Sequence, residues 1–239
     1  MIEISRTFKQ IAVLLDPEKL TANSIAAWAE RINQAQPDFI FLGGSTFCGS
    51  IDSIASLLKK NTHIPIVLFP GNNKQLTPYA DGLLLLSLIS SRNAELLIGQ
   101  HVEAAPIIRS FGLQTISTGY ILIDGGRESA TQRVSRSLPI ERDNIQLAAN
   151  TALAAELLGM QSVYLEAGSG ALQPIPQDMI RQVKKTISIP LIVGGGLKNH
   201  SDITNAIDGG ADLVVIGNHF EQNADEMADF CSFVHSFNK

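Results

Sequence analysis

The chain has 239 residues, 45% of them hydrophobic, and a formal net charge of -5 at pH 7. Lysine and arginine number 18 against 23 acidic residues, which argues against a nucleic-acid-binding protein. The sequence shows no signal peptide and no apolar run of transmembrane length, and two isolated cysteines and five scattered histidines predict neither a disulfide framework nor a zinc site. We therefore expect one cytoplasmic globular domain over residues 1–239, without stable membrane insertion.

Short apolar runs alternate with helical patterns along the chain, as is typical of a parallel sheet covered by helices. Eight runs are predicted strands: 11–15, 39–42, 66–69, 82–86, part of 115–123, 162–165, 191–193 and 213–216. Eight strand-helix units predict a β/α barrel. In a later helical segment the leucines recur at the spacing of one helix face, at positions 147, 153, 157 and 158.

The connection between the third and fourth predicted strands is irregular. Only residues 70–81 are available, and they include two prolines, a glycine and two asparagines. Since a full crossover helix hardly fits there, we predict that the third helix is missing or replaced by an extended segment. The resulting gap at the mouth of the barrel could admit a long hydrophobic ligand.

Polar residues follow the first two predicted strands, at the end of the barrel where barrel enzymes place their chemistry. Asp16 follows the first strand, where a carboxylate suits Mg²⁺ together with phosphate oxygens and water. Alternatively, Asp16 caps a turn, since Asp-Pro initiates turns. Ser45 and Thr46 follow the second strand, where their hydroxyl groups could complete a metal shell or cap the next helix.

The sixth strand is followed by the segment richest in chemistry. Tyr164 and Glu166 are two positions apart and share a strand face, and a Gly-Ser-Gly turn at 168–170 follows. A partly buried glutamate has a raised pKa and can act as a general base, with the tyrosine as a hydroxyl donor. The alternative is that Glu166 belongs to a structural ion pair.

Glycines end the last two predicted strands, at 194–196 and at Gly217, which Asn218 follows. Glycines let the backbone approach an anion closely, and the helix after each strand points free N–H groups at the same place. After strands seven and eight of a β/α barrel this pair predicts a phosphate site.

Together these residues resemble the geranylgeranylglyceryl phosphate synthases and their bacterial heptaprenyl relatives, in the branch shared by some archaea and Bacteroidetes-type bacteria. The stretches that carry the resemblance are LDPEK (15–19), FLGGST (41–46), LFPGN (68–72), SLISSRN (87–93), GQHVEA (99–104), TGYILIDGG (118–126), YLEAGSG (164–170), VGGG (193–196) and IGN (216–218). The resemblance implies a modified TIM barrel without its third helix. It also implies transfer of a polyprenyl group, such as geranylgeranyl, from its diphosphate to the C3 hydroxyl of sn-glycerol 1-phosphate, with release of pyrophosphate.

Site residues follow from the same resemblance. Asp16 and Ser45 would bind Mg²⁺, and Glu166 would be the base. Glycerol phosphate would be held by Tyr164, Leu165, Glu166, Ala167, Gly168, Ser169, Gly170, Gly195, Gly196, Gly217 and Asn218. Some members carry a lysine two residues before the strand-one aspartate, where this chain has Leu14, so that lysine's role is not transferred here. The resemblance also points to a homo-oligomer.

Other functions stay open. A sugar-phosphate isomerase would use Asp16 as an acid or base, and a non-catalytic protein would only hold a phosphorylated ligand or a lipid. A Schiff-base aldolase is disfavoured because no lysine lies at a predicted strand end. Residues 83–89 and a helix over 93–109 are candidate walls for a prenyl groove, although most of those leucines suit a plain core. Four arginines in the loop 127–142 could sit over the diphosphate or face solvent.

Overall fold

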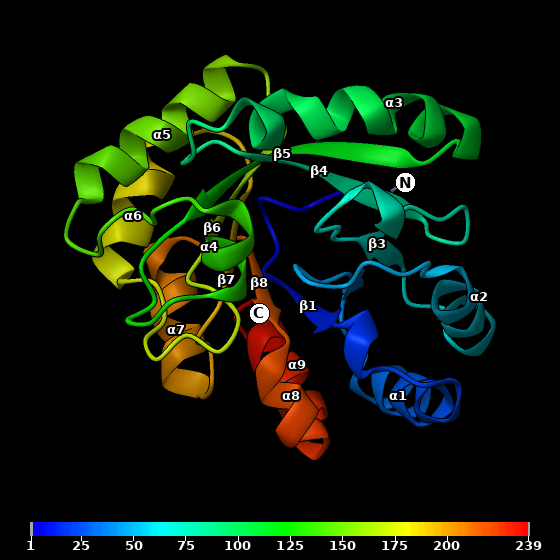
Figure 1. Ribbon diagram of the computed structural model, residues 1–239. Coiled ribbons are helices and arrows are strands. Elements are labelled where there is room, and N and C mark those ends of the chain that lie inside the picture. The colour runs from blue at the N-terminus through cyan, green and yellow to red at the C-terminus, as the bar shows by residue number, and fades with distance from the viewer. Residues whose placement is uncertain (1, 239) are drawn as a thin grey trace.

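The computed structural model describes residues 2–238, in which eight parallel strands close into a barrel and β8 pairs with β1 (Figure 1). The strands are β1 (Gln10–Leu15), β2 (Phe39–Leu42), β3 (Ile66–Leu68), β4 (Gly82–Leu88), β5 (Gln114–Leu122), β6 (Ser162–Glu166), β7 (Leu191–Gly194) and β8 (Leu213–Ile216). Every predicted strand is confirmed, and the predicted β/α barrel with it.

Two layers of apolar side chains hold the barrel together, because successive residues of a strand point to opposite faces. Val214 and Ile216 of β8 pack outward against the helices, whereas Leu213 and Val215 fill the interior of the barrel. The same alternation places Tyr164 inside the barrel and Leu165 under the helices. Glu166, two positions after Tyr164, therefore faces inward at the end of β6.

Helices surround the barrel between most strand pairs. They are α1 (Ala22–Ala35), α2 (Asp52–Asn61), α3 (Gln100–Phe111), α4 (Ala130–Ser135), α5 (Ile145–Leu157), α6 (Gln177–Thr186), α7 (His200–Gly209), α8 (Asn218–Gln222) and α9 (Met227–Ser236), and a π-helical turn (Glu95–Gly99) precedes α3. Single 3-10 turns lie at Pro17–Lys19, Asn73–Gln75 and Ala224–Glu226. No helix within residues 2–238 is both long and apolar enough to cross a membrane.

The third crossover helix is absent, as predicted from the short connection. Between β3 and β4 the chain forms only the 3-10 turn at Asn73–Gln75 and extended backbone. This segment packs beside α3, since the Asn73 side chain donates a 2.9 Å hydrogen bond to Glu103, and the last residues of β3 and β4, Leu68 and Leu88, are buried.

The helix α5 forms where the leucine spacing indicated a helix, but its buried face consists of other residues. Its buried residues are alanines, at positions 148, 149, 152 and 155, and they pack against the barrel. Leu147, Leu157 and Leu158 are instead 42%, 79% and 75% exposed. Small side chains let this helix lie close to the sheet, so the leucines are left on the outer surface.

Candidate functional site

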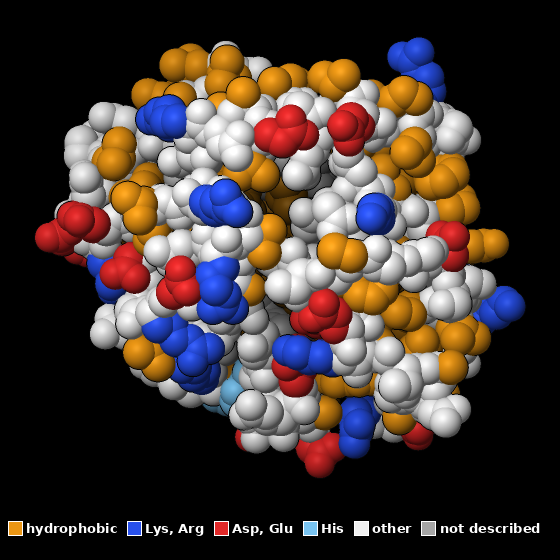
Figure 2. Space-filling view, viewed as in Figure 1, with side chains coloured by type: hydrophobic (Ala, Val, Ile, Leu, Met, Phe, Trp, Pro, Cys, Tyr) orange, Lys and Arg blue, Asp and Glu red, His pale blue; other side chains and the backbone are white. Residues whose placement is uncertain are grey.

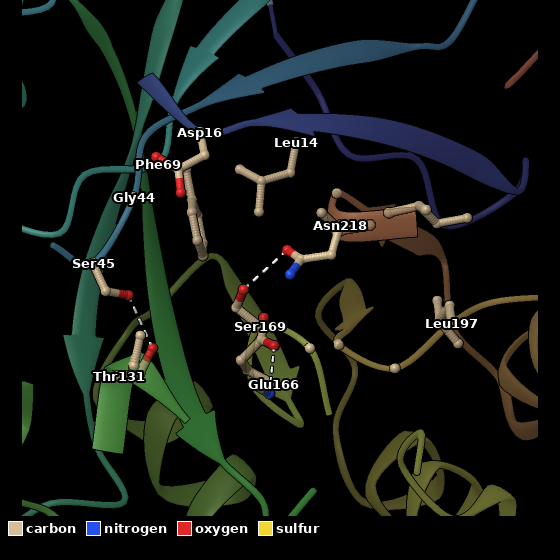
Figure 3. A pocket seen from close by; sticks show the side chains of 18 of the residues that line it. Leu14, Asp16, Gly44, Ser45, Phe69, Thr131, Glu166, Ser169, Leu197 and Asn218 are labelled. Atoms are coloured by element: carbon tan, nitrogen blue, oxygen red, sulfur yellow. Dashed lines mark hydrogen bonds between the residues drawn. The ribbon is translucent and has the colours of Figure 1, made fainter. Parts of the chain in front are cut away.

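A cavity of about 110 Å³ opens at the carboxyl ends of the strands (Figure 3), in the central hollow visible in Figure 2. Its walls come from the loops after β1, β2, β6, β7 and β8 and from α4 and α8. It brings together nearly all predicted site residues: Asp16, Ser45, Tyr164, Glu166, Gly168, Ser169, Gly170, Gly195, Gly196, Gly217 and Asn218. Leu165 and Ala167 do not line the cavity, because their side chains belong to the core beneath the helices.

The predicted phosphate cradle lies on one side of this cavity. Gly195 has a φ of 83° in the left-handed region, and a Cβ atom there would come within 2.5 Å of Glu166 Oε1. Only glycine allows the backbone of this turn to lie so close to the carboxylate. The Ser169 hydroxyl donates a hydrogen bond of 2.9 Å to Asn218 Oδ1, which joins the loop after β6 to the start of α8.

Glu166 lies at the centre of the cavity floor with a side chain that is almost fully buried. Burial raises its pKa to about 7, although the Gly168 N–H, which donates a 2.6 Å hydrogen bond to Oε1, and the nearby Tyr164 hydroxyl both act to lower it. Among the described residues Glu166 has no ion-pair partner, so the structural ion-pair interpretation is wrong. A carboxylate with a pKa near neutrality is suited to accept a proton.

Tyr164 lies below Glu166, with its ring inside the barrel. Its ring packs against those of Phe69 and Tyr120, at centroid distances of 5.4 and 5.3 Å. Burial, followed by the charge of Glu166, raises the pKa of its hydroxyl well above the ordinary value, so the group stays protonated. The hydroxyl has no hydrogen-bond partner within residues 2–238, so its proton is available to a ligand or to Glu166.

Asp16 and Ser45 lie on the opposite side of the cavity. Asp16 Oδ1 accepts a hydrogen bond of 3.0 Å from the Glu18 N–H, so Asp16 does cap the turn after β1 and also lines the cavity. Its Oδ1 would lie 2.8 Å from a Cβ atom on Gly44, which places the carboxylate directly against the loop that carries Ser45. The hydroxyl of Ser45 lies 3.1 Å from that of Thr131, and α2 begins seven residues later, so Ser45 does not cap it.

This donor set fits a hard divalent cation. One carboxylate and one hydroxyl are oxygen ligands, and Mg²⁺ commonly takes one or two carboxylates and completes its shell with substrate phosphates and water. No group of three or more metal-ligating side chains occurs in the described part of the chain, so a cage built from protein alone is not present.

An apolar groove of about 310 Å³ adjoins the cavity and shares with it the residues Gly44, Ser45, Phe69, Tyr120 and Thr131. Its apolar walls are Leu86 and Leu88 of β4 and Leu96 of the π-helical turn, from the two segments predicted to form a prenyl groove. Other leucines of the first segment, Leu83 and Leu84, are core. Pro70 and Gly71, at the start of the segment that replaces the third helix, also line the groove.

Sequence reasoning missed several residues of the cavity wall. Tyr120 pairs in register with Tyr164, so the alternation of β5 would have placed it inside the barrel. Thr131 carried no such signal, because it reaches Ser45 from a short helix 86 residues away. The ion pair between Lys19 Nζ and Glu221 Oε2, at 2.6 Å, likewise joins the turn after β1 to α8, 202 residues away.

Comparison with known proteins gives consistent matches. The model of the PcrB family matches residues 5–234. A geranylgeranylglyceryl phosphate synthase of Zunongwangia profunda is 50% identical over 214 residues, which are 89% of this chain and 91% of that protein. A protein of the same name from Korarchaeum cryptofilum is 41% identical over 219 residues, 91% of this chain and 90% of the relative.

Solved structures agree with the sequence matches. The crystal structure of (S)-3-O-geranylgeranylglyceryl phosphate synthase from Thermoplasma acidophilum in complex with sn-glycerol-1-phosphate is 31% identical, with a TM-score of 0.91, and the match covers 97% of this chain and 95% of that one. A thiamine phosphate pyrophosphorylase from Pyrococcus furiosus, at 13% identity and a TM-score of 0.59, shares the fold alone.

Proposed function

Because the chain belongs to the PcrB family, we infer that it is a prenyltransferase that moves a geranylgeranyl-like polyprenyl group from its diphosphate to the C3 hydroxyl of sn-glycerol 1-phosphate. The products are an ether lipid precursor and pyrophosphate. The observation that carries this function is one cavity in which a buried glutamate and a glycine cradle face Asp16, and which opens directly onto an apolar groove. An isomerase does not require that groove beside that cradle, and a protein that only holds a phosphorylated lipid does not require a buried glutamate with a raised pKa in the same cavity.

The acceptor would be held by the cradle. Backbone N–H groups around Gly195, Gly196 and Gly217, together with Asn218, offer hydrogen bonds to the phosphate. An acceptor fixed by its phosphate presents its far hydroxyl to the centre of the cavity. Positioning of this kind converts a meeting of two substrates into a reaction within one complex.

Glu166 would accept the proton of the C3 hydroxyl while that oxygen forms its bond to the first carbon of the prenyl chain. The bond between this carbon and the diphosphate oxygen breaks, and the electron pair leaves with pyrophosphate. The groove between Leu86, Leu88 and Leu96 would hold the prenyl tail and exclude water from the reacting carbon. A Glu166 pKa of about 7 keeps part of the enzyme in the basic form at neutral pH.

The diphosphate end would require a cation. Asp16 and Ser45 are the residues that would hold Mg²⁺, which when bound neutralises the charge of the leaving diphosphate. Leu14 lines the same cavity, at the position where some relatives carry a lysine. The cationic contact that such a lysine would offer is therefore absent from this chain.

The direct test is to incubate the purified protein and Mg²⁺ with labelled sn-glycerol 1-phosphate and prenyl diphosphates of graded length. We expect a labelled, lipid-soluble ether product with the sn-1 enantiomer and little with sn-glycerol 3-phosphate as control. Tight binding of the acceptor without product from any prenyl diphosphate would instead identify a binding protein. Conversion of a sugar phosphate without Mg²⁺ would identify an isomerase.

We also propose that the protein is a homo-oligomer. Large apolar side chains that are exposed on α3 and at the end of α5 support this proposal, since exposed apolar surface favours contact with another protein. They include Val102, Ile107 and Phe111 on α3, Leu157 at the end of α5 and Leu158 directly after it.

A further inference from the structure

The loop between β5 and α5 carries four arginines, and the structure gives them different surroundings. Arg142 donates hydrogen bonds to the carbonyls of Asp124 and Pro174, at 3.0 and 2.8 Å, and so ties the loops after β5 and β6 together. Arg133 faces Glu128 in an exposed ion pair at 3.7 Å. Arg136 is exposed at the end of α4. These three arginines therefore have structural or solvent-facing surroundings.

Arg127 is also exposed and does not itself line the cavity, but it differs from the others because its guanidinium lies against the Gly-Ser-Gly turn, which does. The backbone at its root is held in place, since the Gly125 carbonyl accepts hydrogen bonds from the N–H groups of Leu172 and Gln173 at 2.9 and 3.2 Å. A Cβ atom on Gly170 would clash with Arg127 Nη2, so the guanidinium rests against the backbone of the Gly-Ser-Gly turn. The same point lies 3.6 Å from Asn218 Nδ2.

The guanidinium has no other partner in the described chain. Within residues 2–238 Arg127 makes no hydrogen bond and no ion pair, although it is a fork of five donors. Figure 2 shows Lys and Arg side chains gathered on one rim of the central hollow, beside α4. Donors from Arg127 and Asn218 thus lie together beside Gly170, which lines the cavity.

The charge of the cavity explains why a cation is needed there. The carboxylates of Asp16, Glu166 and Glu221 line it, together with the ammonium group of Lys198, which donates a 3.5 Å hydrogen bond to the Leu172 carbonyl. Lys19 pairs with Glu221 at 2.6 Å and lies 3.9 Å from Asp16. A phosphate dianion that binds near Glu166 meets repulsion from this charge unless a cation lies beside it. Arginine matches a phosphate better than lysine does, because its planar fork forms two parallel charge-assisted hydrogen bonds.

We propose that Arg127 is a specificity-determining residue that binds the phosphate of the acceptor across the Gly168–Gly170 turn, and so selects a phosphorylated glycerol over glycerol itself. This assignment rests on the proposed function. It places the arginine on the acceptor phosphate, and not over the prenyl diphosphate on the Asp16 side of the cavity.

The test is calorimetric binding of sn-glycerol 1-phosphate, without prenyl diphosphate, to the wild type and to Arg127→Gln. We expect the variant to bind about 10- to 100-fold more weakly, because a hydrogen bond to a charged group contributes a corresponding factor. Arg127→Lys keeps the charge without the fork and should bind with intermediate affinity. The control is Arg133→Gln in the same loop, which should bind like the wild type, and inorganic phosphate serves as a second probe.

Steady-state kinetics separates the two phosphate sites. In Arg127→Gln the KM for the acceptor should rise by the factor found in binding, and the KM for the prenyl diphosphate should not change. Unchanged acceptor affinity, or a change confined to the prenyl diphosphate, overturns the assignment. If Arg127→Gln does not fold, Arg127→Lys decides by the same criteria. If the wild type binds the acceptor but transfers no prenyl group, the proposed function is refuted. The role of Arg127 is still tested in that case, because the binding comparison does not depend on prenyl transfer.

Discussion

Glu166 combines two properties that compete with each other, since its carboxylate is buried and yet must ionise to work. Its pKa lies near 7 because the barrel mouth desolvates the charge, and the hydrogen bond from the Gly168 N–H offsets only part of that cost. The buried, ionised carboxylate therefore lowers the stability of the folded protein, which is typical of a functional carboxylate. The variant Glu166→Gln tests both the role of this carboxylate in the reaction and its effect on stability.

Glu166→Gln should lower the rate of prenyl transfer by about 10² to 10⁴, the usual effect of losing a general base. The amide keeps an oxygen that can accept from the Gly168 N–H, so folding and acceptor binding should persist. In the wild type the rate should fall about tenfold for each pH unit below 7, as the base becomes protonated. Rate measurements from pH 5 to 8 check both statements, and near wild-type turnover by the variant removes Glu166 from the mechanism.

Thermal unfolding of the same variant provides the control. The native pKa of about 7 lies above the ordinary 4.5, so the folded wild type binds the proton more tightly and loses stability as the pH rises from about 4.5 to about 7. This loss amounts to about 3 kcal/mol at most. Glu166→Gln should therefore be more stable than the wild type at pH 8 and similar to it at pH 4.5. A variant that is less stable at pH 8 would indicate a structural role.

Asp16→Asn tests the metal assignment. A carboxamide is a poor ligand for Mg²⁺, so we expect activity to fall by about 1,000-fold and to stop responding to added Mg²⁺, as loss of several kcal/mol of charge stabilisation implies. Acceptor binding should persist, because the cradle lies on the other side of the cavity. Glu18→Gln, two residues away on the same turn, is the matched control and should respond to Mg²⁺ like the wild type. An active, metal-independent Asp16→Asn would refute the assignment.

The segment that replaces the third helix holds the loop after β2 in place, although it has little regular structure. Gln75 is fully buried and uses all four of its hydrogen-bonding positions. Its Oε1 accepts from the N–H groups of Gly44 and Gly71, and its Nε2 donates to the carbonyls of Gly44 and Phe47, at 2.7 to 3.2 Å. This amide therefore holds the loop after β2, which carries Ser45.

Gln75→Met should lower the free energy of unfolding by about 2 to 4 kcal/mol, because it leaves several buried backbone groups without partners. Urea denaturation measures the change. The control is Lys74→Met, the same new side chain at the exposed neighbouring position, which should change stability by less than about 0.5 kcal/mol. If the two variants are equally stable, the amide network contributes nothing to the fold.

Features that a short stretch of sequence determines could be predicted, whereas features that depend on contacts between distant residues could not. Local apolar runs predicted all eight strands, and their final residues predicted the cavity that contains Asp16, Glu166 and the glycine cradle. Ser45 contacts Thr131 of α4, which is 86 residues away, and the loop after β2 contacts Gln75, which is 31 residues away. No local sequence pattern indicates such contacts. The leucine spacing indicated the helix α5 but not its inward face, because alanine, and not leucine, fits between that helix and the sheet.

At the scale of the whole molecule, the outward leucines of α5 and the apolar residues of α3 predict association with a second copy. Figure 2 shows apolar side chains along the edge of the molecule where α3 runs. Combined Val102→Glu and Leu157→Glu should shift the protein toward the monomer, as charged groups would be buried without partners. Light scattering coupled to size-exclusion chromatography measures the mass. Phe8→Glu, outside both helices, is the control, and an unchanged mass in the double variant would contradict this interface.

The closed ring of strands limits how any such association can occur. In an open sheet, the outermost strands carry unpaired N–H and C=O groups to which a strand from another chain can be added. Here β8 pairs with β1, so the barrel strands present no such border. Two copies cannot join by extending the sheet, and contacts with other molecules must be made by helix faces and connecting loops. Changes on the outer helices can therefore alter assembly while the hydrogen-bonded frame beneath the catalytic cavity stays intact.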